Sequence, residues 1–167
     1  MRPFACAICT ALAFTAFSTP GPALAGPDPA APTAAPNAAG VIRLRSDTGF
    51  DDTVARLKAD VQAKGIRFFD AIDQSGLGAA AELKIRRSTL VLFGNPPLGV
   101  QFLQSNPYAG LDWPVRMLVV EEADGSVWVA WTDFGYIADR YAIKDRTAQF
   151  KMAGEVAASI AASATAR

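Results

Sequence analysis

The sequence predicts one α+β domain of two layers, in which helices cover one face of a mostly antiparallel or mixed β-sheet. Strand-like segments follow one another directly, without the helix that a parallel crossover needs, and this disfavours a doubly wound parallel fold. Asp124-Gly125 lies between two such segments and is a strong signal for a tight hairpin. With 167 residues, 51% of them hydrophobic, the chain is long enough for one packed core but short for two.

The first predicted elements are a strand, a helix and a second strand. Residues 41–45 and residues 66–73 are rich in β-forming side chains. Between them, apolar residues recur at the spacing of one helical face, and Gly65 follows as a C-terminal stop. That apolar stripe consists of Phe50, Val54, Leu57 and Val61. A turn is expected over residues 74–78.

The middle of the chain predicts three further strands and a short helix. Residues 89–93 form a continuous apolar run, which is typical of a central strand buried on both faces. A helix is expected over residues 98–105 and is ended by Pro107. Residues 115–121 and 127–132 are the two strands that bracket the hairpin signal.

Two helices complete the predicted domain. The first has an apolar stripe at Phe134, Ile137 and Tyr141, and the second is the alanine-rich segment 145–164. The predicted order is therefore strand, helix, strand, strand, helix, strand, strand, helix, helix. The last helix carries charged side chains in its middle, so it is not expected to span a membrane. Its narrow apolar stripe suits packing on its own sheet or on a second copy, and a homodimer is one expectation.

Residues 1–25 have the pattern of a secretory signal peptide. Arg2 is the only charge, an apolar run follows over residues 5–17, and residues 23–25 form a small-x-small cleavage site that would leave Gly26 as the new N-terminus. A membrane anchor is the alternative, but the apolar run is shorter than the ~20 residues that a spanning helix needs. We therefore expect cleavage and a periplasmic or secreted product.

The segment after the leader, residues 26–40, mixes prolines with alanines and offers little to bury, so it predicts a disordered linker. Both cysteines of the chain, Cys6 and Cys9, lie in the leader, so the mature domain has no disulfide. Acylation of one of them in a lipoprotein is an alternative, which the shortness of the apolar region before them disfavours.

The charge of the chain indicates neither nucleic acid nor an anionic lipid surface as a partner. Sixteen basic residues balance sixteen acidic ones, and loss of Arg2 with the leader leaves 15 against 16. A near-neutral surface without a basic cluster provides no electrostatic footprint for a polyanion.

The composition also limits the chemistry. The chain has no histidine, and no cysteine after residue 25, so no cofactor and no zinc, copper or haem site is expected. Aspartates could serve a hard cation, but they lack calcium-loop spacing. A Ser-His-Asp triad is excluded, and no lysine lies in a motif that would pair it with a serine.

Residues 90–143 combine several short motifs in a fixed order: FGNPPLG after a strand, LDWP before the next strand, the DG hairpin, and DFGYIA at the start of a helix. In this combination the segment resembles the domain of unknown function family 302. The resemblance covers nearly all of residues 41–143, which leaves residues 144–167 as a C-terminal alanine-rich helix. It implies a compact α+β domain of bacterial proteins, often alone or exported, without an assigned reaction.

Two positions depart from the family pattern. The family usually has histidine directly after an Ile-Asp pair, where this chain has Gln74, and again in the helix after the last strand, where it has Tyr141. Any proton transfer or metal binding that those histidines carry in relatives is therefore not expected here.

The candidate ligand site is the loop 94–99, which joins a buried strand to a helix. Free backbone amides at a helix N-terminus can hold an anion, although the glycine spacing is not that of a phosphate loop. The alternative is a rigid turn fixed by an asparagine and two prolines. Aromatic side chains nearby suit a pocket or an interface. The residues expected to hold a small ligand or a partner are Gly94, Asn95, Gly99, Asp112, Trp113, Asp133, Tyr136 and Gln74.

Three classes of function stay open. The leading hypothesis is a binding domain rather than an enzyme. The rival is a hydrolase or isomerase that uses Asp70, Asp73, Asp112 or Asp133 as acid or base, and it requires two of them to meet in one cleft. Helix capping explains Asp133 equally well, and a bulge or a wet sheet edge explains Asp70. The third class is a structural or stress-related accessory protein.

Overall fold

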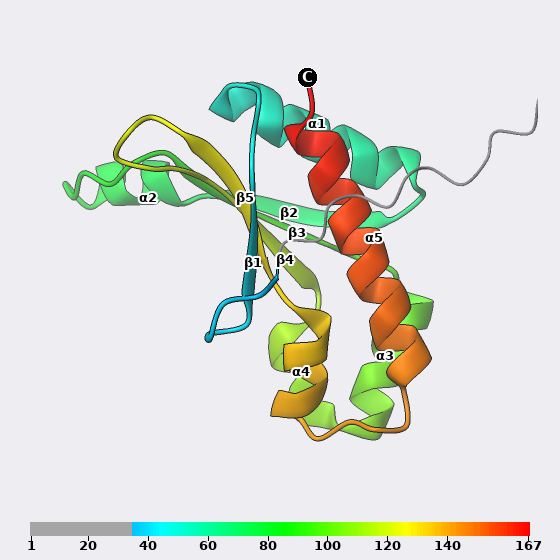
Figure 1. The fold of residues 1–167 in the computed structure, drawn as a ribbon. Coiled ribbons are helices and arrows are strands. Elements are labelled where there is room, and N and C mark those ends of the chain that lie inside the picture. Colours follow the sequence, from blue (N-terminus) through cyan, green and yellow to red (C-terminus); the bar gives the residue numbers. More distant parts are fainter. Residues whose placement is uncertain (1–34) are drawn as a thin grey trace, which may run out of the picture.

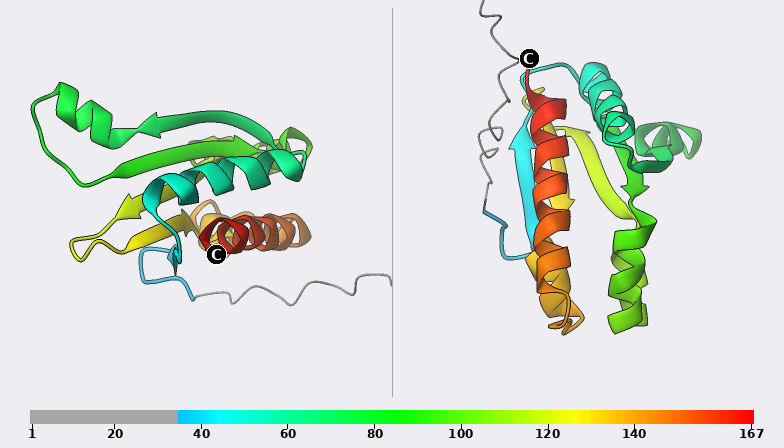
Figure 2. Two further views of the ribbon diagram at one scale, coloured as in Figure 1. Left: turned by 90° about the horizontal axis from the view of Figure 1, so that it is seen from above. Right: turned by 90° about the vertical axis from the view of Figure 1, so that its right-hand side faces the viewer.

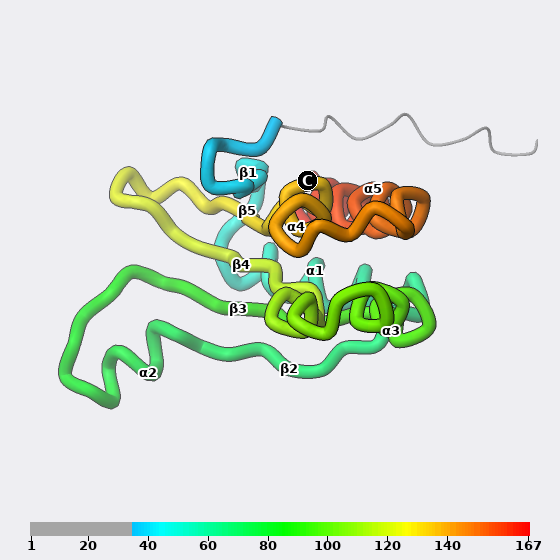
Figure 3. The backbone as a smooth tube through the Cα atoms, turned by 90° about the horizontal axis from the view of Figure 1, so that it is seen from below, coloured from blue at the N-terminus to red at the C-terminus, as the bar shows by residue number. Residues whose placement is uncertain are grey.

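A computed structural model describes residues 35–167 and confirms the α+β fold. Five strands form one antiparallel sheet in the order β1-β5-β4-β3-β2, which Figure 3 shows from below. The strands are β1 (Val41–Arg45), β2 (Arg67–Asp73), β3 (Ser88–Gly94), β4 (Val115–Glu121) and β5 (Val127–Thr132). The two edges of the sheet are therefore β1 and β2.

Helices form the second layer and close one end of the sheet. They are α1 (Phe50–Ala63), α2 (Gln74–Ala80), α3 (Pro96–Ser105), the 3-10 helix η1 (Pro107–Asp112), α4 (Phe134–Arg140) and α5 (Thr147–Thr165). The long helices α1 and α5 contact each other and pack on one face of the sheet (Figures 1 and 2). α3 and α4 lie at one end of the strands, and α2 projects from the opposite end (Figure 1).

The core lies between the sheet and the pair α1 and α5. Alternate residues of β5 face it, as the hairpin pattern predicts, because side chains on a strand point to opposite faces in turn. Its largest fully buried apolar side chains are Phe93, Leu57, Met117, Ile160, Val61, Val91, Val119 and Val129. Burial of each such side chain stabilises the fold by about 1.5–3 kcal/mol before entropy is counted.

Local hydrogen bonds explain where the helices differ from expectation. Residues 74–78, expected as a turn, begin α2, because the Asp73 carboxylate accepts the N–H of Gly76 at 2.9 Å and caps the helix. α3 begins at Pro96, since proline suits the first turn of a helix. Pro107 likewise opens η1, where the Asn106 side chain accepts the N–H of Tyr108 at 3.0 Å.

The bulge expected at Asp70 is present. The register of β2 against β3 shifts between Phe68 and Asp70, and β2 is an edge strand. The Asp70 carboxylate is exposed and accepts the N–H of Ala71 at 2.7 Å. This side chain therefore avoids the core by a local change of register.

The predicted leader, residues 1–25, lies outside the described residues, and so does most of the predicted linker 26–40. The last linker residues form a turn, in which the Gly40 carbonyl accepts the N–H of Asp133 at 2.7 Å. Gly40 has φ +71°, and a methyl group there would lie 2.2 Å from the Tyr136 ring. The end of the linker is therefore part of the fold. Within residues 35–167, no helix has the length and apolar character to cross a bilayer.

Candidate functional site

The loop 94–99 is filled by the side chain of Trp113. A methyl group at Gly99 would lie 1.8 Å from Trp113 Nε1, and one at Gly94 would lie 3.2 Å from the same atom. Both glycines are buried. The space that these glycines leave open is therefore occupied by the indole of the chain itself.

Asp112 is a buried structural carboxylate. Its side chain is 3% exposed and forms ion pairs with Arg116 and Arg140. The Tyr141 hydroxyl donates to Asp112 Oδ2 at 2.6 Å, and this hydrogen bond raises the pKa of Tyr141. The void beside Asp112 has a volume of about 10 Å³, which is room for one water molecule and too small for a ligand.

Asp133 and Asn95 stand at the starts of helices. The Asp133 carboxylate accepts the N–H of Tyr136 at 2.8 Å, so it caps α4 as the alternative interpretation predicts. The Asn95 side chain is exposed and forms no capping hydrogen bond, while its carbonyl accepts the N–H of Gly99 at 2.9 Å. These contacts account for both residues without a ligand.

Gln74 lies at the opposite end of the sheet from the other predicted site residues. It follows β2, whose last residue Asp73 pairs with Thr89 near the start of β3, whereas Gly94 ends β3. The Ser88 hydroxyl donates to Gln74 Oε1 at 2.7 Å. The predicted site residues are therefore divided between the two ends of the sheet.

The carboxylates that a hydrolase or isomerase would need do not meet in one cleft of the described chain. Asp112 is engaged by arginines, and Asp73 and Asp133 cap different helices at opposite ends of the sheet. Asp70 is exposed on the edge strand. No pair of them has the common reactive position that acid and base catalysis requires.

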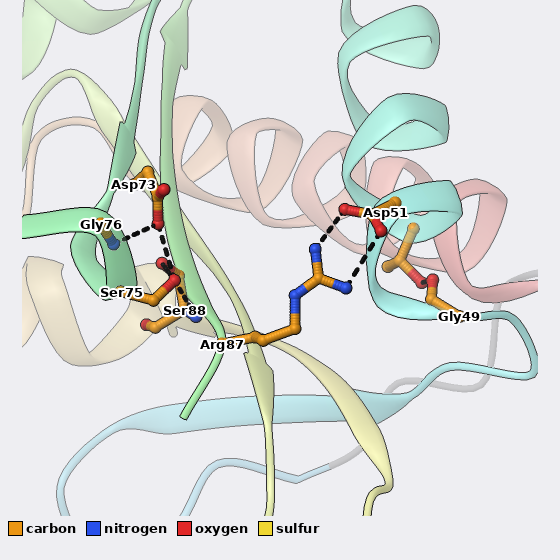
Figure 4. Close-up of polar contacts among 8 residues, drawn as sticks. Gly49, Asp51, Asp73, Ser75, Gly76, Arg87 and Ser88 are labelled. Atoms are coloured by element: carbon orange, nitrogen blue, oxygen red, sulfur yellow. Dashed lines mark hydrogen bonds and ion pairs between the residues drawn. The ribbon is translucent and has the colours of Figure 1, made fainter. Parts of the chain in front are cut away.

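A polar cleft of about 440 Å³ opens between the first turns of α1 and the adjoining ends of β2 and β3. We call it the α1–β3 cleft. Figure 4 shows part of its polar lining: Asp51 of α1, Asp73 at the end of β2, Ser75 in α2 and Arg87 directly before β3. The cleft is lined by Phe50, Asp51, Val54, Ala55, Lys58, Ala71, Asp73, Ser75, Arg87 and Thr89.

Arg87 and Asp51 form an ion pair at the cleft. Arg87 Nη1 donates to Asp51 Oδ2 at 3.0 Å, Nη2 donates to Oδ1, and the guanidinium carbon lies 4.3 Å from the centre of the Phe50 ring (Figure 4). The hydrogen bond from Arg87 lowers the pKa of Asp51. The Arg87 and Asp51 side chains are 47% and 79% exposed, and such a pair stabilises a fold by only about 0–1 kcal/mol. The pair therefore orients the Arg87 guanidinium and leaves it accessible to solvent and to a ligand.

Asp73 is ionised and already engaged at neutral pH. It accepts the Ser75 hydroxyl at 2.6 Å and the Gly76 N–H at 2.9 Å (Figure 4). These hydrogen bonds, that of Ser75 first, lower the pKa of Asp73. A carboxylate with a lowered pKa is a poor general base near neutral pH, so Asp73 contributes a fixed negative charge to the α1–β3 cleft.

A buried hydroxyl cluster holds the start of α1. Thr53, which is fully buried, lies 2.7 Å from the Ser46 hydroxyl and 3.0 Å from the Thr48 hydroxyl, and it donates to the Gly49 carbonyl at 2.8 Å. This network fixes the loop that precedes Asp51. The position of Asp51 at the cleft is therefore set by buried contacts.

A second hollow, of about 550 Å³, lies between α4 and α5. Apolar side chains such as Phe134, Phe150 and Trp131 line it, and charged side chains stand at its rim. Of the predicted site residues, Asp133 lines this hollow. Within residues 35–167, no group of three or more acidic, cysteine or histidine side chains is placed to hold a metal ion.

The sequence contains only a weak signal for the α1–β3 cleft. Among the residues singled out from the sequence, Asp73, a candidate acid or base, lines the cleft, and Gln74, the next residue and one of the two departures from the family pattern, lies beside it. Asp51 and Arg87 are 36 residues apart, and no local spacing connects them. Their pairing depends on how α1 crosses the start of β3, which is a property of the tertiary fold.

Comparisons with known proteins identify relatives of the chain. It is 29% identical over 104 residues to "Fluoride-specific ion channel FluC 1" of Brucella suis and of Brucella abortus. The match takes in 62% of this chain but 41% and 38% of those relatives, so the chain spans about two fifths of their length.

A solved structure shares the fold. The crystal structure of an uncharacterized conserved protein DUF302 from Bacillus stearothermophilus superposes with a TM-score of 0.67 at 14% sequence identity, covering 73% of this chain and 95% of that one. The sequence pattern of the family "Domain of unknown function DUF302" matches residues 42–164, and so extends beyond residue 143 into α5. The chain therefore belongs to the DUF302 family.

Proposed function

We propose that this chain is an exported binding protein that holds a small anionic molecule in the α1–β3 cleft. The observation that carries the proposal is the arrangement of charge around that cleft. Both of its carboxylates are engaged by groups of the chain, Asp51 by Arg87 and Asp73 by Ser75 and Gly76. The two cations of the lining are Lys58 and Arg87, and more of their N–H donors are left for a ligand, since Arg87 uses two of its five on Asp51.

Lys58 is the clearest case. Its ammonium nitrogen lies 5.8 Å from the centre of the Phe68 ring, and within residues 35–167 no carboxylate lies at ion-pair distance from it. Arg87 can donate to a ligand while it stays paired with Asp51, because a guanidinium carries five N–H donors. Two acidic and two basic side chains line the cleft, so its formal charge balances, and an anionic group between Lys58 and Arg87 would give Lys58 the counter-charge that it has not found within residues 35–167.

The remaining lining suits the body of a small organic molecule. Phe50, Val54 and Ala71 provide apolar surface, and the hydroxyls of Ser75 and Thr89 provide hydrogen-bonding groups. A volume of about 440 Å³ lies within the range of small-molecule sites. The ligand class is therefore a small molecule with one carboxylate or phosphate group and an apolar portion.

The binding proposal is tested by calorimetric titration of the protein with a panel of aromatic and aliphatic monocarboxylates and phosphate monoesters. Native mass spectrometry of protein recovered from its own cells searches for a ligand that co-purifies. Arg87→Gln should weaken binding about 10- to 100-fold, because a hydrogen bond to a charged group contributes about 1.5–3 kcal/mol. Arg86→Gln is the matched control, since Arg86 is exposed and does not line the cleft.

Two results would count against the binding proposal. One is a protein that binds no member of the panel and carries no ligand from the cell. The other is binding that Arg87→Gln leaves unchanged or that Arg86→Gln weakens equally. The second result would place the ligand elsewhere, with the hollow between α4 and α5 as the next site to examine.

Export is tested separately. The pattern of residues 1–25 supports cleavage before Gly26. Cell fractionation followed by N-terminal sequencing should find a product in the periplasm or medium that begins at Gly26. A full-length chain in the cytoplasm would refute the export proposal and leave the binding proposal untouched.

The names of the relatives favour a second candidate, an accessory role in fluoride tolerance. Proteins called fluoride-specific ion channels share a 104-residue segment with this chain, and this role belongs to the stress-related class above. A strain that lacks the gene should grow more slowly than its parent in sodium fluoride but equally well in sodium chloride. Equal growth in both salts would exclude this role.

A further inference from the structure

The hollow between α4 and α5 reaches the hydrophobic core. Its volume of about 550 Å³ lies within the range of small-molecule sites. Five of its lining side chains belong to the core and are at most 6% exposed: Ile42, Trp131, Phe134, Ile143 and Phe150. They come from β1, β5, α4, the loop after α4, and α5, so elements distant in the sequence enclose one apolar space. We call it the α4–α5 hollow.

Small residues on both helices keep the α4–α5 hollow open. α4 contributes Gly135 and Ala138, and α5 contributes Gly154 and Ala158. Glycine inside a helix destabilises it relative to alanine. A methyl group at Gly154 would lie 3.7 Å from Phe134, an ordinary contact distance, so the packing of the helices does not require glycine there. Gly154 instead enlarges the space between them, and apolar cavities of this kind take up apolar molecules.

Trp131 adds a hydrogen-bond donor without a partner to this apolar lining. The residue is 6% exposed, and a buried indole N–H normally finds a partner, as Trp128 Nε1 does at 2.9 Å from the Ser126 hydroxyl. Trp131 Nε1 donates to no group within residues 35–167. It is not sealed from solvent either, because in the same part of the chain Arg146 Nε is the only fully buried side-chain nitrogen or oxygen without a partner. The open space that Trp131 lines is the α4–α5 hollow, so a partner for its N–H has to enter there.

The charges around the α4–α5 hollow favour an uncharged ligand. Three acidic and two basic side chains line it: Asp133, Asp139, Glu155, Lys144 and Lys151. Lys151 is paired with Glu155, and Asp133 caps α4. The lining therefore has no excess of positive charge for an anion, and a free N–H donor does not suit a cation. A carbonyl oxygen would satisfy that donor without adding charge.

We infer that the α4–α5 hollow is a second ligand site, which binds a small uncharged molecule with an apolar ring system and a carbonyl oxygen. The oxygen accepts the Trp131 indole N–H, and the rings of Phe134 and Phe150 contact the apolar part of the ligand. This ligand differs in charge from the anion proposed for the α1–β3 cleft, and no residue lines both sites. Each site can therefore be tested while the other is left intact.

The probe is prodan, an uncharged naphthyl ketone whose fluorescence shifts to shorter wavelength when it moves from water into apolar surroundings. Titration of the full chain with prodan should show that shift and should saturate with a micromolar dissociation constant. Dimethylaminonaphthalene, which has the same ring and amine without the ketone, is the matched ligand. It should bind about 2- to 10-fold more weakly, which is the effect of one hydrogen bond between uncharged groups.

Two variants of α5 test where prodan binds. Ala158→Leu fills the hollow with a larger apolar side chain and should weaken prodan binding at least tenfold. Ala162→Leu is the matched control, because Ala162 is also half-buried in α5, lies one turn further along and does not line the hollow. Circular dichroism checks that both variants are folded.

The nuclear magnetic resonance signal of the Trp131 indole N–H tests the hydrogen bond in the unaltered protein. Of the indole signals of the three tryptophans, that of Trp131 should shift most when prodan binds. Trp131→Phe, which lacks the indole N–H, identifies the signal by its loss. The same variant should bind prodan and dimethylaminonaphthalene equally well.

Four results would overturn the inference. They are no binding of prodan at hundreds of micromolar, equal binding of the two probes to the parent protein, a Trp131 signal that prodan leaves in place, and an Ala158→Leu variant that binds prodan no more weakly than Ala162→Leu does. Arg87→Gln should leave prodan binding unchanged, because Arg87 lines the α1–β3 cleft and not the hollow. Failure of this inference is therefore distinguishable from failure of the proposed function.

Discussion

Gly99→Ala tests whether Trp113 fills the loop 94–99. The added methyl would lie 1.8 Å from Trp113 Nε1 and 2.5 Å from its Cδ1, whereas non-bonded carbon and nitrogen atoms sit about 3.5 Å apart. The indole would have to move by well over 1 Å, against its contacts with Gly94 and Phe69. Overpacking of this kind costs about 1–3 kcal/mol, partly offset by about 1 kcal/mol from the better helix propensity of alanine in α3. We expect a net loss of about 1 kcal/mol, and at most about 2 kcal/mol.

The assay is urea unfolding followed by circular dichroism. Gly154→Ala is the control, because Gly154 lies inside α5 and its nearest contact for a new methyl is an ordinary 3.7 Å. This control should gain up to about 1 kcal/mol from helix propensity. In a Trp113→Ala background the obstacle is absent, so Gly99→Ala should cost less than about 0.5 kcal/mol there. A Gly99→Ala variant as stable as the parent, or an equal loss in both backgrounds, would refute the packing argument.

Three further predictions concern the buried polar groups and the effect of acid. Thr53→Val leaves its hydroxyl partners unpaired and should lower the free energy of unfolding by about 1–3 kcal/mol in urea titrations, while Thr53→Ser should lose much less. Asp112→Asn removes the charge that holds two arginines and should cost about 2–4 kcal/mol by the same assay; a loss below 0.5 kcal/mol would show that its ion pairs are dispensable. Because folding lowers the pKa of Asp51 and Asp73 from 3.8, their contribution is full above that pH and is lost as pH falls through the lowered values. The urea midpoint should therefore fall on acidification below about pH 4, and less steeply in the Asp51→Asn, Asp73→Asn double variant; equal slopes would contradict this assignment.

Strands and long helices could be predicted from the sequence because their signals are local. The hairpin strands 115–121 and 127–132 agree with β4 and β5, since Asp124-Gly125 fixes the turn between two β-rich segments. α1 likewise follows its apolar stripe and ends before Gly65. α2 could not be predicted, because two glycines disfavour it and the Asp73 cap that secures it was an ambiguous signal.

The candidate site was harder to predict because distant residues build it. The motif FGNPPLG indicates a ligand loop, but its glycines leave the space that the Trp113 side chain occupies. Trp113 follows α3 and η1 in the chain. In the α1–β3 cleft, Arg87 meets Asp51 only because α1 crosses the sheet near the start of β3. Local patterns show where glycine is needed, but they do not reveal which distant side chain packs against that glycine.

The two positions that depart from the family pattern bear on what relatives with histidine there can do. Gln74 follows β2 at one end of the sheet, and Tyr141 follows α4 at the other, so strands of about 20 Å separate them. Histidines at these positions in one chain of this fold could not share a metal ion or act as a paired acid and base. At the Tyr141 position, an imidazole would meet a buried carboxylate equivalent to Asp112, whereas Tyr141 keeps that hydrogen bond with a group whose pKa is raised. Near neutral pH Tyr141 therefore keeps its proton and preserves the contact with Asp112 without titrating.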